Sequence, residues 1–157
     1  MKLSFLQSAL LTITNKNLLV LNLSISLILL GIILITQLVN YPLFIQVKSK
    51  DFKNFHNFYV SRISYCVGPV ILIELLIAII LLLSFNTILY SINFGLVILF
   101  LLSTILIQVP IHNQINNFYN IFLISKLIKT NMIRTFLCII KCILSYTILI
   151  KEIIWTY

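Results

Sequence analysis

The chain has 157 residues, of which 61% are hydrophobic and 9% are charged, and its mean hydropathy is +1.15. A soluble protein of this length could not bury so much apolar side chain, so these values predict an integral membrane protein of one domain, residues 1–157. The net charge of +8 does not indicate nucleic-acid binding. Most of the Lys and Arg residues lie at the ends of apolar runs, where they fit lipid headgroups.

The first fourteen residues have an amphipathic pattern. Leu3, Leu6, Leu10 and Ile13 recur at helical spacing between polar residues, which predicts a short N-terminal interfacial helix. A cleaved signal peptide with Lys2 in its charged region is the alternative, although no small-residue cleavage site follows.

Four apolar stretches are each long enough to cross a bilayer, which takes about 20 residues. Their predicted limits are 18–39, 60–83, 88–109 and 133–150. A short turn at 85–87 joins the second and third spans, whereas the connections 40–59 and 110–132 are longer and carry most of the polar residues. The sequence predicts an all-α, polytopic four-transmembrane-helix bundle without an internal repeat.

The distribution of Lys and Arg predicts the orientation. Seven of them lie in or beside the two long connections, at positions 48, 50, 53, 62, 126, 129 and 134, and only Lys2, Lys16 and Lys151 lie at the other end. Short cytoplasmic loops carry an excess of such residues. We therefore expect a multi-pass protein of the cell inner (plasma) membrane, with the long loops cytoplasmic and both termini outside.

Each predicted span carries a polar stripe at helical spacing, which indicates a bundle with a polar interior. The stripes include Asn22, Ser26, Gln37 and Asn40 on the first span, Glu74 on the second, Thr104 and Gln108 on the third, and Arg134, Cys138, Lys141 and Ser145 on the fourth. Such residues either hold the helices together by hydrogen bonds or line a functional site.

Glu74 is the only acidic residue inside a span, and a carboxylate at bilayer depth normally has a partner or a task. The second and fourth spans run in the same direction, so Lys141 is expected to reach Glu74. The pair then either fixes the helix register or takes part in chemistry. Gly68-Pro69 predicts a kink in the second span shortly before Glu74.

Distinctive residues converge at the end of the bundle that is predicted to be cytoplasmic. His56 and His112 could ligate a metal or a haem iron, with Glu74 as a further oxygen ligand, or they could act as acid and base. Histidines that only form hydrogen bonds are the simpler alternative. The candidate site comprises His56, Glu74 and His112 as catalytic groups, with Arg62, Asn113, Arg134 and Lys141 as ligand-binding groups.

A family resemblance accompanies these residues. The runs Tyr41-Pro42-Leu43-Phe44, Phe55-His56, Arg62-Ile63, Pro110-Ile111-His112 and Arg134-Thr135 resemble a family of short, uncharacterised bacterial four-helix integral membrane proteins, over about residues 38–141. The chain is more distantly similar to anthrone oxygenase-like membrane proteins, which share a Pro-x-Asn-type end of the third helix and an Arg opening the fourth. It departs from the closer family at Tyr59, often a second His there, at Met132, often Trp, and at Lys141, often Arg.

The closer resemblance implies only the architecture and the candidate positions, whereas the distant one implies cofactor-independent oxidation of an aromatic substrate. Three function classes stay open. They are a membrane protein that binds a redox cofactor, a metal or a small anionic molecule, an oxygenase-like enzyme for an apolar substrate, and a non-catalytic subunit or assembly factor. We favour the first, without a named cofactor. The expected partners are the lipid bilayer and either another membrane protein or a second copy of the chain.

Overall fold

The computed structural model describes the backbone of residues 2–85 and 87–154 and the side chains of residues 16–85 and 87–154. All regular structure in these residues is helical, which confirms the all-α prediction. The elements are α1 (Lys2–Ile35), the π turn η1 (Thr36–Asn40), α2 (Tyr41–Leu43), the 3₁₀ turn η2 (Phe44–Gln46), α3 (Ser49–Ser84), α4 (Ile88–Ser103), the π turn η3 (Thr104–Gln108), α5 (Val109–Asn117) and α6 (Ile121–Ile154).

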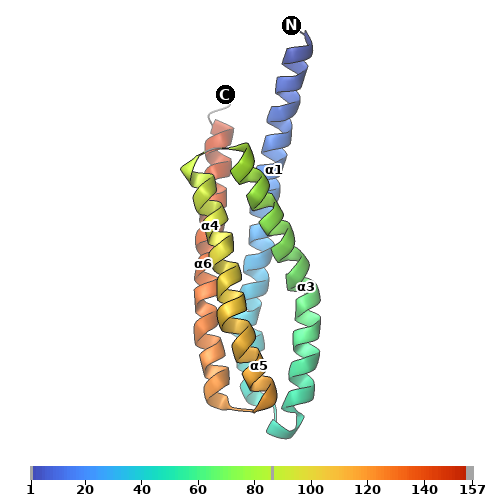
Figure 1. Cartoon of the computed structure of the whole chain (residues 1–157), viewed down its shortest axis with the longest axis vertical. Helices are drawn as coiled ribbons and strands as arrows, with labels where there is room; N and C mark the ends of the chain where they lie inside the picture. The colour runs from blue at the N-terminus through green and yellow to red at the C-terminus, as the bar shows by residue number, and fades with distance from the viewer. Residues whose placement is uncertain (1, 86, 155–157) are drawn as a thin grey trace.

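Four helical segments of the described chain are long and apolar enough to cross a membrane, as a multi-pass membrane protein requires. They are Lys16–Gln46, Ser49–Ser84, Ile88–Asn117 and Ile121–Ile154. Their directions alternate, so that the start of α1 and the end of α6 lie at the same end of the bundle (Figure 1). Both α1 and α4 pack against α3 and α6, so that α1 and α4 lie diagonally opposite each other.

The prediction of two long loops at 40–59 and 110–132 is wrong. Only Val47 and Lys48 separate η2 from α3, and only residues 118–120 separate α5 from α6. The polar residues of these segments lie on additional helical turns, where buried side chains such as Phe52 and His56 recur four residues apart. The short turn between the second and third spans is confirmed, because α3 ends at Ser84 and α4 begins at Ile88.

Residues 2–14 are helical, as predicted, but no break separates them from the first span, because α1 runs on to Ile35. These first turns project beyond the other helices (Figure 1). The predicted interfacial position of residues 2–14 depends on their side chains, which are not among those that the structure describes.

The π turns η1 and η3 interrupt the first and third spans at corresponding places. In each, the amide of the residue before a proline donates to the carbonyl oxygen five residues back, from Tyr41 to Thr36 and from Val109 to Thr104. Proline lacks an N–H group, and its ring clashes with the carbonyl four residues earlier. Widening the turn before it to a π turn lets the helix continue past the proline.

The two π turns share a sequence pattern, Thr-x-x-x-Asn/Gln-x-Pro, at residues 36–42 and 104–110. In both, the threonine hydroxyl donates to the carbonyl oxygen four residues earlier, at 2.9 Å. The expectation of no internal repeat overlooked this short local repetition. The predicted kink at Pro69 has a counterpart in the structure, since α3 contains this proline and changes direction near its middle (Figure 1).

Candidate functional site

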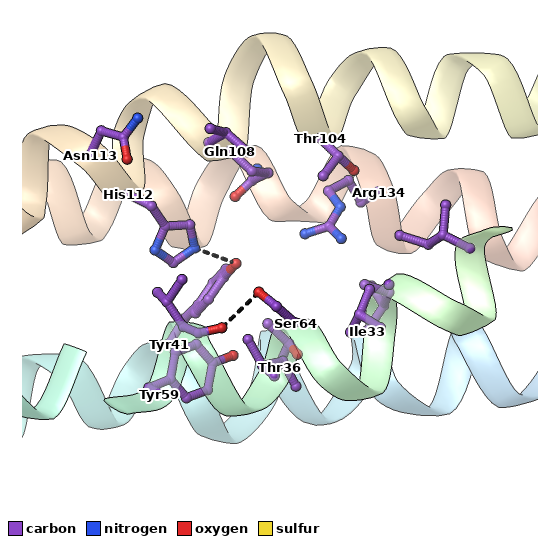
Figure 2. Close-up of a pocket in the computed structure, with 16 residues that line it drawn as sticks. Ile33, Thr36, Tyr41, Tyr59, Ser64, Thr104, Gln108, His112, Asn113 and Arg134 are labelled. Carbon is purple, nitrogen blue, oxygen red and sulfur yellow. Dashed lines mark hydrogen bonds between the residues drawn. The ribbon is translucent and has the colours of Figure 1, made fainter. Parts of the chain in front are cut away.

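A cavity of about 290 Å³ lies inside the bundle, and His112 is among the residues that line it (Figure 2). Apolar side chains such as Ile33, Ile63 and Val67 form much of its wall. Its polar and charged lining residues are Thr36, Tyr41, Tyr59, Ser64, Thr104, Gln108, His112, Asn113 and Arg134. Threonine or glutamine side chains of both π turns reach it, so the two local distortions of the helices border the same cavity.

The mouth of the cavity lies between α3 and α5. The lining residues Ser64 on α3 and Val109 and Asn113 on α5 are exposed on the side of the bundle, within helices that are long and apolar enough to span a membrane. An apolar molecule could therefore enter sideways from the hydrocarbon region of a bilayer.

Arg134 is the charged group of the cavity, and its side chain points into it (Figure 2). The residue is 5% exposed. Its Nη1 donates to Asn131 Oδ1 at 3.1 Å, and its guanidinium carbon lies 4.8 Å from the centroid of the Phe100 ring. Its buried Nε has no hydrogen-bond partner among the described residues.

No carboxylate side chain neutralises Arg134 in the part of the chain that the structure describes. The chain has three acidic residues. Glu74 pairs with Lys141, and Asp51 is exposed near the start of α3. Glu152 accepts a hydrogen bond from Tyr90 and lies about 27 Å along α6 from Arg134 at ~1.5 Å per residue. Arg134 thus combines a buried positive charge, an unused donor and an adjoining cavity.

The two histidines lie together, as the sequence predicted, and bond directly to each other. His56 Nε2 is 2.8 Å from His112 Nδ1, and His112 Nε2 is 3.0 Å from Tyr41 Oη. His56 is 2% exposed and stacks on Phe52, with ring centroids 5.5 Å apart. A continuous hydrogen-bonded chain therefore runs from Tyr41 in the cavity wall through His112 to His56 behind it.

The structure does not place Glu74 close enough to the two histidines for the three residues to share a metal ion. Glu74 lies about 27 Å along α3 from His56 at ~1.5 Å per residue, too far for both to hold one ion. Among the described residues, no group of three His, Cys, Asp or Glu side chains lies within reach of one metal ion. The expectation of Glu74 as a further ligand to the histidine pair is therefore wrong.

Glu74 and Lys141 form the expected ion pair, with Lys141 Nζ 3.0 Å from Glu74 Oε1. Lys141 Nζ also donates to Ser26 Oγ at 2.8 Å and to Asn22 Oδ1 at 3.3 Å. Three acceptors therefore match the three protons of the ammonium group. Such saturation favours the interpretation in which the pair fixes the register of the helices.

The predicted single site is therefore divided between several places. The cavity contains His112, Asn113 and Arg134, whereas Glu74 and Lys141 belong to a separate buried cluster. Arg62 lies outside both, because it is exposed and its guanidinium carbon lies 5.3 Å from the Phe58 ring centroid.

The predicted catalytic and ligand-binding groups omitted Tyr41, which lines the cavity beside His112 and bonds to it. Thr36 was also missed. The repeated Thr-x-x-x-Asn/Gln-x-Pro pattern could have pointed to both, since Thr36 begins the first copy and Tyr41 directly precedes its proline.

Comparison of the chain with protein-family models, with curated proteins and with solved structures gives no match. The resemblance to the bacterial four-helix proteins and to the anthrone oxygenase-like proteins stays an expectation from the sequence.

Proposed function

We propose that the protein binds, in this cavity, a small amphipathic molecule whose oxygen-bearing head is an anion or a weak acid. The observation that carries this proposal is the buried Arg134, which has an unused Nε donor and no nearby carboxylate among the described residues. Arginine's planar group suits oxygen anions and makes charge-assisted hydrogen bonds to them.

Burial of an uncompensated charge is unfavourable, so a ligand that brings the missing acceptor gains more here than in water. The cavity volume of about 290 Å³ lies near the lower limit for small-molecule pockets. The head of the ligand occupies it, and the apolar remainder extends through the mouth between α3 and α5 into the bilayer.

The proposal includes a location. The protein resides in a bacterial inner membrane with the histidine end of the bundle in the cytoplasm and both termini outside. Five exposed lysines near the histidine end of α3 and α6 support this orientation: Lys48, Lys50, Lys53, Lys126 and Lys129. A C-terminal alkaline phosphatase fusion is expected to be active and a C-terminal green fluorescent protein fusion dark, and the reverse pattern would contradict the orientation.

Binding of radiolabelled laurate to the protein in nanodiscs of zwitterionic lipid tests the function. Hydrogen bonds to a charged group contribute about 1.5–3 kcal/mol, so Arg134→Gln should weaken laurate binding by about tenfold to a hundredfold. Arg62→Gln is the matched control, because it removes an exposed arginine outside the cavity, and it should leave the affinity unchanged.

A cation with the same tail completes the test. Dodecyltrimethylammonium shares the apolar chain of laurate but carries the opposite charge, so it should not displace laurate from the protein. Equal laurate affinity of the wild type and the Arg134→Gln variant would contradict the proposal, as would efficient displacement by the cation.

A further inference from the structure

The proposed binding of an anion rests on Arg134 and leaves the hydrogen-bonded chain Tyr41–His112–His56 unexplained, although this chain begins in the wall of the same cavity. We propose that this chain carries a proton between the head of the bound ligand and His56. The inference rests on the proposed function and narrows the ligand to a weak oxygen acid, such as a phenol, an enol or a carboxylic acid.

The donor and acceptor roles along the chain are consistent in either direction. A neutral imidazole donates with one ring nitrogen and accepts with the other, and a tyrosine hydroxyl can do both. In one arrangement the Tyr41 hydroxyl donates to His112 Nε2, and His112 Nδ1–H donates to His56 Nε2. In the reverse arrangement His56 donates to His112 and His112 donates to Tyr41. The heavy-atom distances of 3.0 and 2.8 Å suit both arrangements.

Starting from the first arrangement, the head of the ligand donates its proton to Tyr41 Oη. Tyr41 passes its own proton to His112 Nε2, and His112 passes its Nδ1 proton to His56 Nε2. Three bonds to hydrogen break, on the ligand, Tyr41 and His112. Three form, on Tyr41, His112 and His56. The ligand becomes an oxygen anion and His56 an imidazolium, and the reverse steps return the proton.

Hydrogen-bonding groups at the two ends of the chain can stabilise the separated anion and proton. The unused Nε–H of Arg134 offers a hydrogen bond to the oxygen that loses its proton. At the other end of the chain, His56 Nδ1 is buried without a partner, as is Oδ1 of Asn116, which interacts with His56. The Nδ1–H of the imidazolium therefore has an acceptor nearby. The other titratable group bordering the cavity is Tyr59, so none of the described carboxylates competes for the proton.

The fluorescent probe 2-naphthol tests the relay, because excitation makes its hydroxyl strongly acidic. The excited molecule emits as naphtholate only where an acceptor takes its proton. The measured signal is the part of the emission that laurate displaces from protein in nanodiscs. The wild type should show naphtholate emission, and Tyr41→Phe should lower the naphtholate fraction at least fivefold while 2-naphthol binding changes less than threefold.

A second variant acts away from the cavity. His56→Phe keeps a ring that can stack on Phe52 but removes the final acceptor, so the naphtholate fraction should fall at least twofold. Tyr65→Phe, an exposed tyrosine on α3, is the control and should leave the emission unchanged.

The outcomes separate the relay from the binding function. Displaceable 2-naphthol that emits equally as naphtholate in the wild type, Tyr41→Phe and His56→Phe overturns the relay and leaves the binding proposal intact. If displaceable 2-naphthol emits only as the neutral form in the wild type, the relay is likewise overturned and the binding proposal stands. If Tyr41→Phe does not bind the probe, His56→Phe decides alone. Absence of laurate-displaceable 2-naphthol in the wild type, together with unaltered laurate binding by Arg134→Gln, overturns both proposals.

Discussion

Two buried cations on α6 lie seven residues apart, about 10 Å along the helix at ~1.5 Å per residue, and their surroundings differ. Lys141 has a carboxylate at 3.0 Å and two further acceptors, one for each ammonium proton. Arg134 has one amide oxygen, the Tyr41 hydroxyl, the face of an aromatic ring and a donor, Nε, without a partner, next to a cavity. Burial of a charge therefore does not by itself indicate a binding site, whereas an incomplete set of partners around a buried charge does.

The chemistry of the two side chains accounts for part of this contrast. The lysine ammonium is compact, and small groups such as Ser26 and Asn22 can surround it from neighbouring turns of α1. The guanidinium group of Arg134 has five donors in a rigid plane, which packed helices satisfy less easily. A ligand with an oxygen head can complete the set.

The largest effect on stability is expected from breaking the ion pair between Lys141 and Glu74. Lys141→Met leaves the Glu74 carboxylate buried without its cation, which typically costs about 3–5 kcal/mol of stability. Unfolding in mixed micelles by a denaturing detergent should show this loss. The double variant Lys141→Met with Glu74→Gln should recover most of it, and a single variant as stable as the wild type would mean that the pair contributes little.

Arg134→Gln should behave differently. The change removes a buried ring contact worth about 2 kcal/mol, but it also removes a buried charge that lacks a carboxylate, which offsets part of this loss. The unliganded variant should therefore lose less than about 2 kcal/mol in the same unfolding assay, even though its laurate affinity falls. A loss as large as that of Lys141→Met would show that an unrecognised partner neutralises Arg134.

A smaller effect is expected at the π turns. Pro110→Ala restores an N–H and removes the clash that favours the wide turn, so η3 should tighten to a regular α-helix and reorient Gln108 in the cavity wall. We expect a severalfold loss of laurate affinity. Leu106→Ala changes an exposed side chain of the same turn, and it should bind as the wild type does. Equal losses in both variants would contradict a specific role of the π turn.

The smallest effect is expected for Arg62→Gln. The residue is exposed, and the one contact described for its guanidinium is with the ring of Phe58. The free energy of unfolding of the variant should therefore differ from that of the wild type by less than about 0.5–1 kcal/mol. Thermal unfolding of this variant beside Arg134→Gln would show whether the two arginines, placed together by the sequence analysis, are as different as their surroundings.

Much of the fold could be predicted because apolar length and helical periodicity determine it. The same arithmetic predicted the Glu74–Lys141 pair, since each residue lies on a long helix and the two helices are parallel. The prediction from apolar length failed at the segments that were expected to be long loops, because residues such as Phe52 and His56 continue the buried face of α3 beyond the apolar span. A hydropathy criterion ends a helix where its polar residues begin, although the helix itself goes on.

The cavity could not be predicted because the π turns break the rotation of about 100° per residue on which face assignments depend. Asn22, Ser26, Gln37 and Asn40 were placed in one sector. In the structure the first two are buried beside Lys141. The latter two, within η1, are half-buried and bond to other partners, Gln37 to the Ile128 carbonyl and Asn40 to the Tyr59 hydroxyl. Arg62 and Arg134 likewise looked equivalent from composition, although one faces outward.

The sideways mouth between α3 and α5 has a consequence for how affinity depends on the tail of a ligand. If the tail stays among the lipids before and after binding, its length does not change the binding equilibrium, provided that the ligand concentration is expressed as ligand per lipid molecule. Counted per volume of water, each added methylene contributes about 0.8 kcal/mol through partitioning alone. Two ligands with the same head and tails of different length would then differ about fourfold per methylene in apparent aqueous affinity, without any difference in their contacts with the protein.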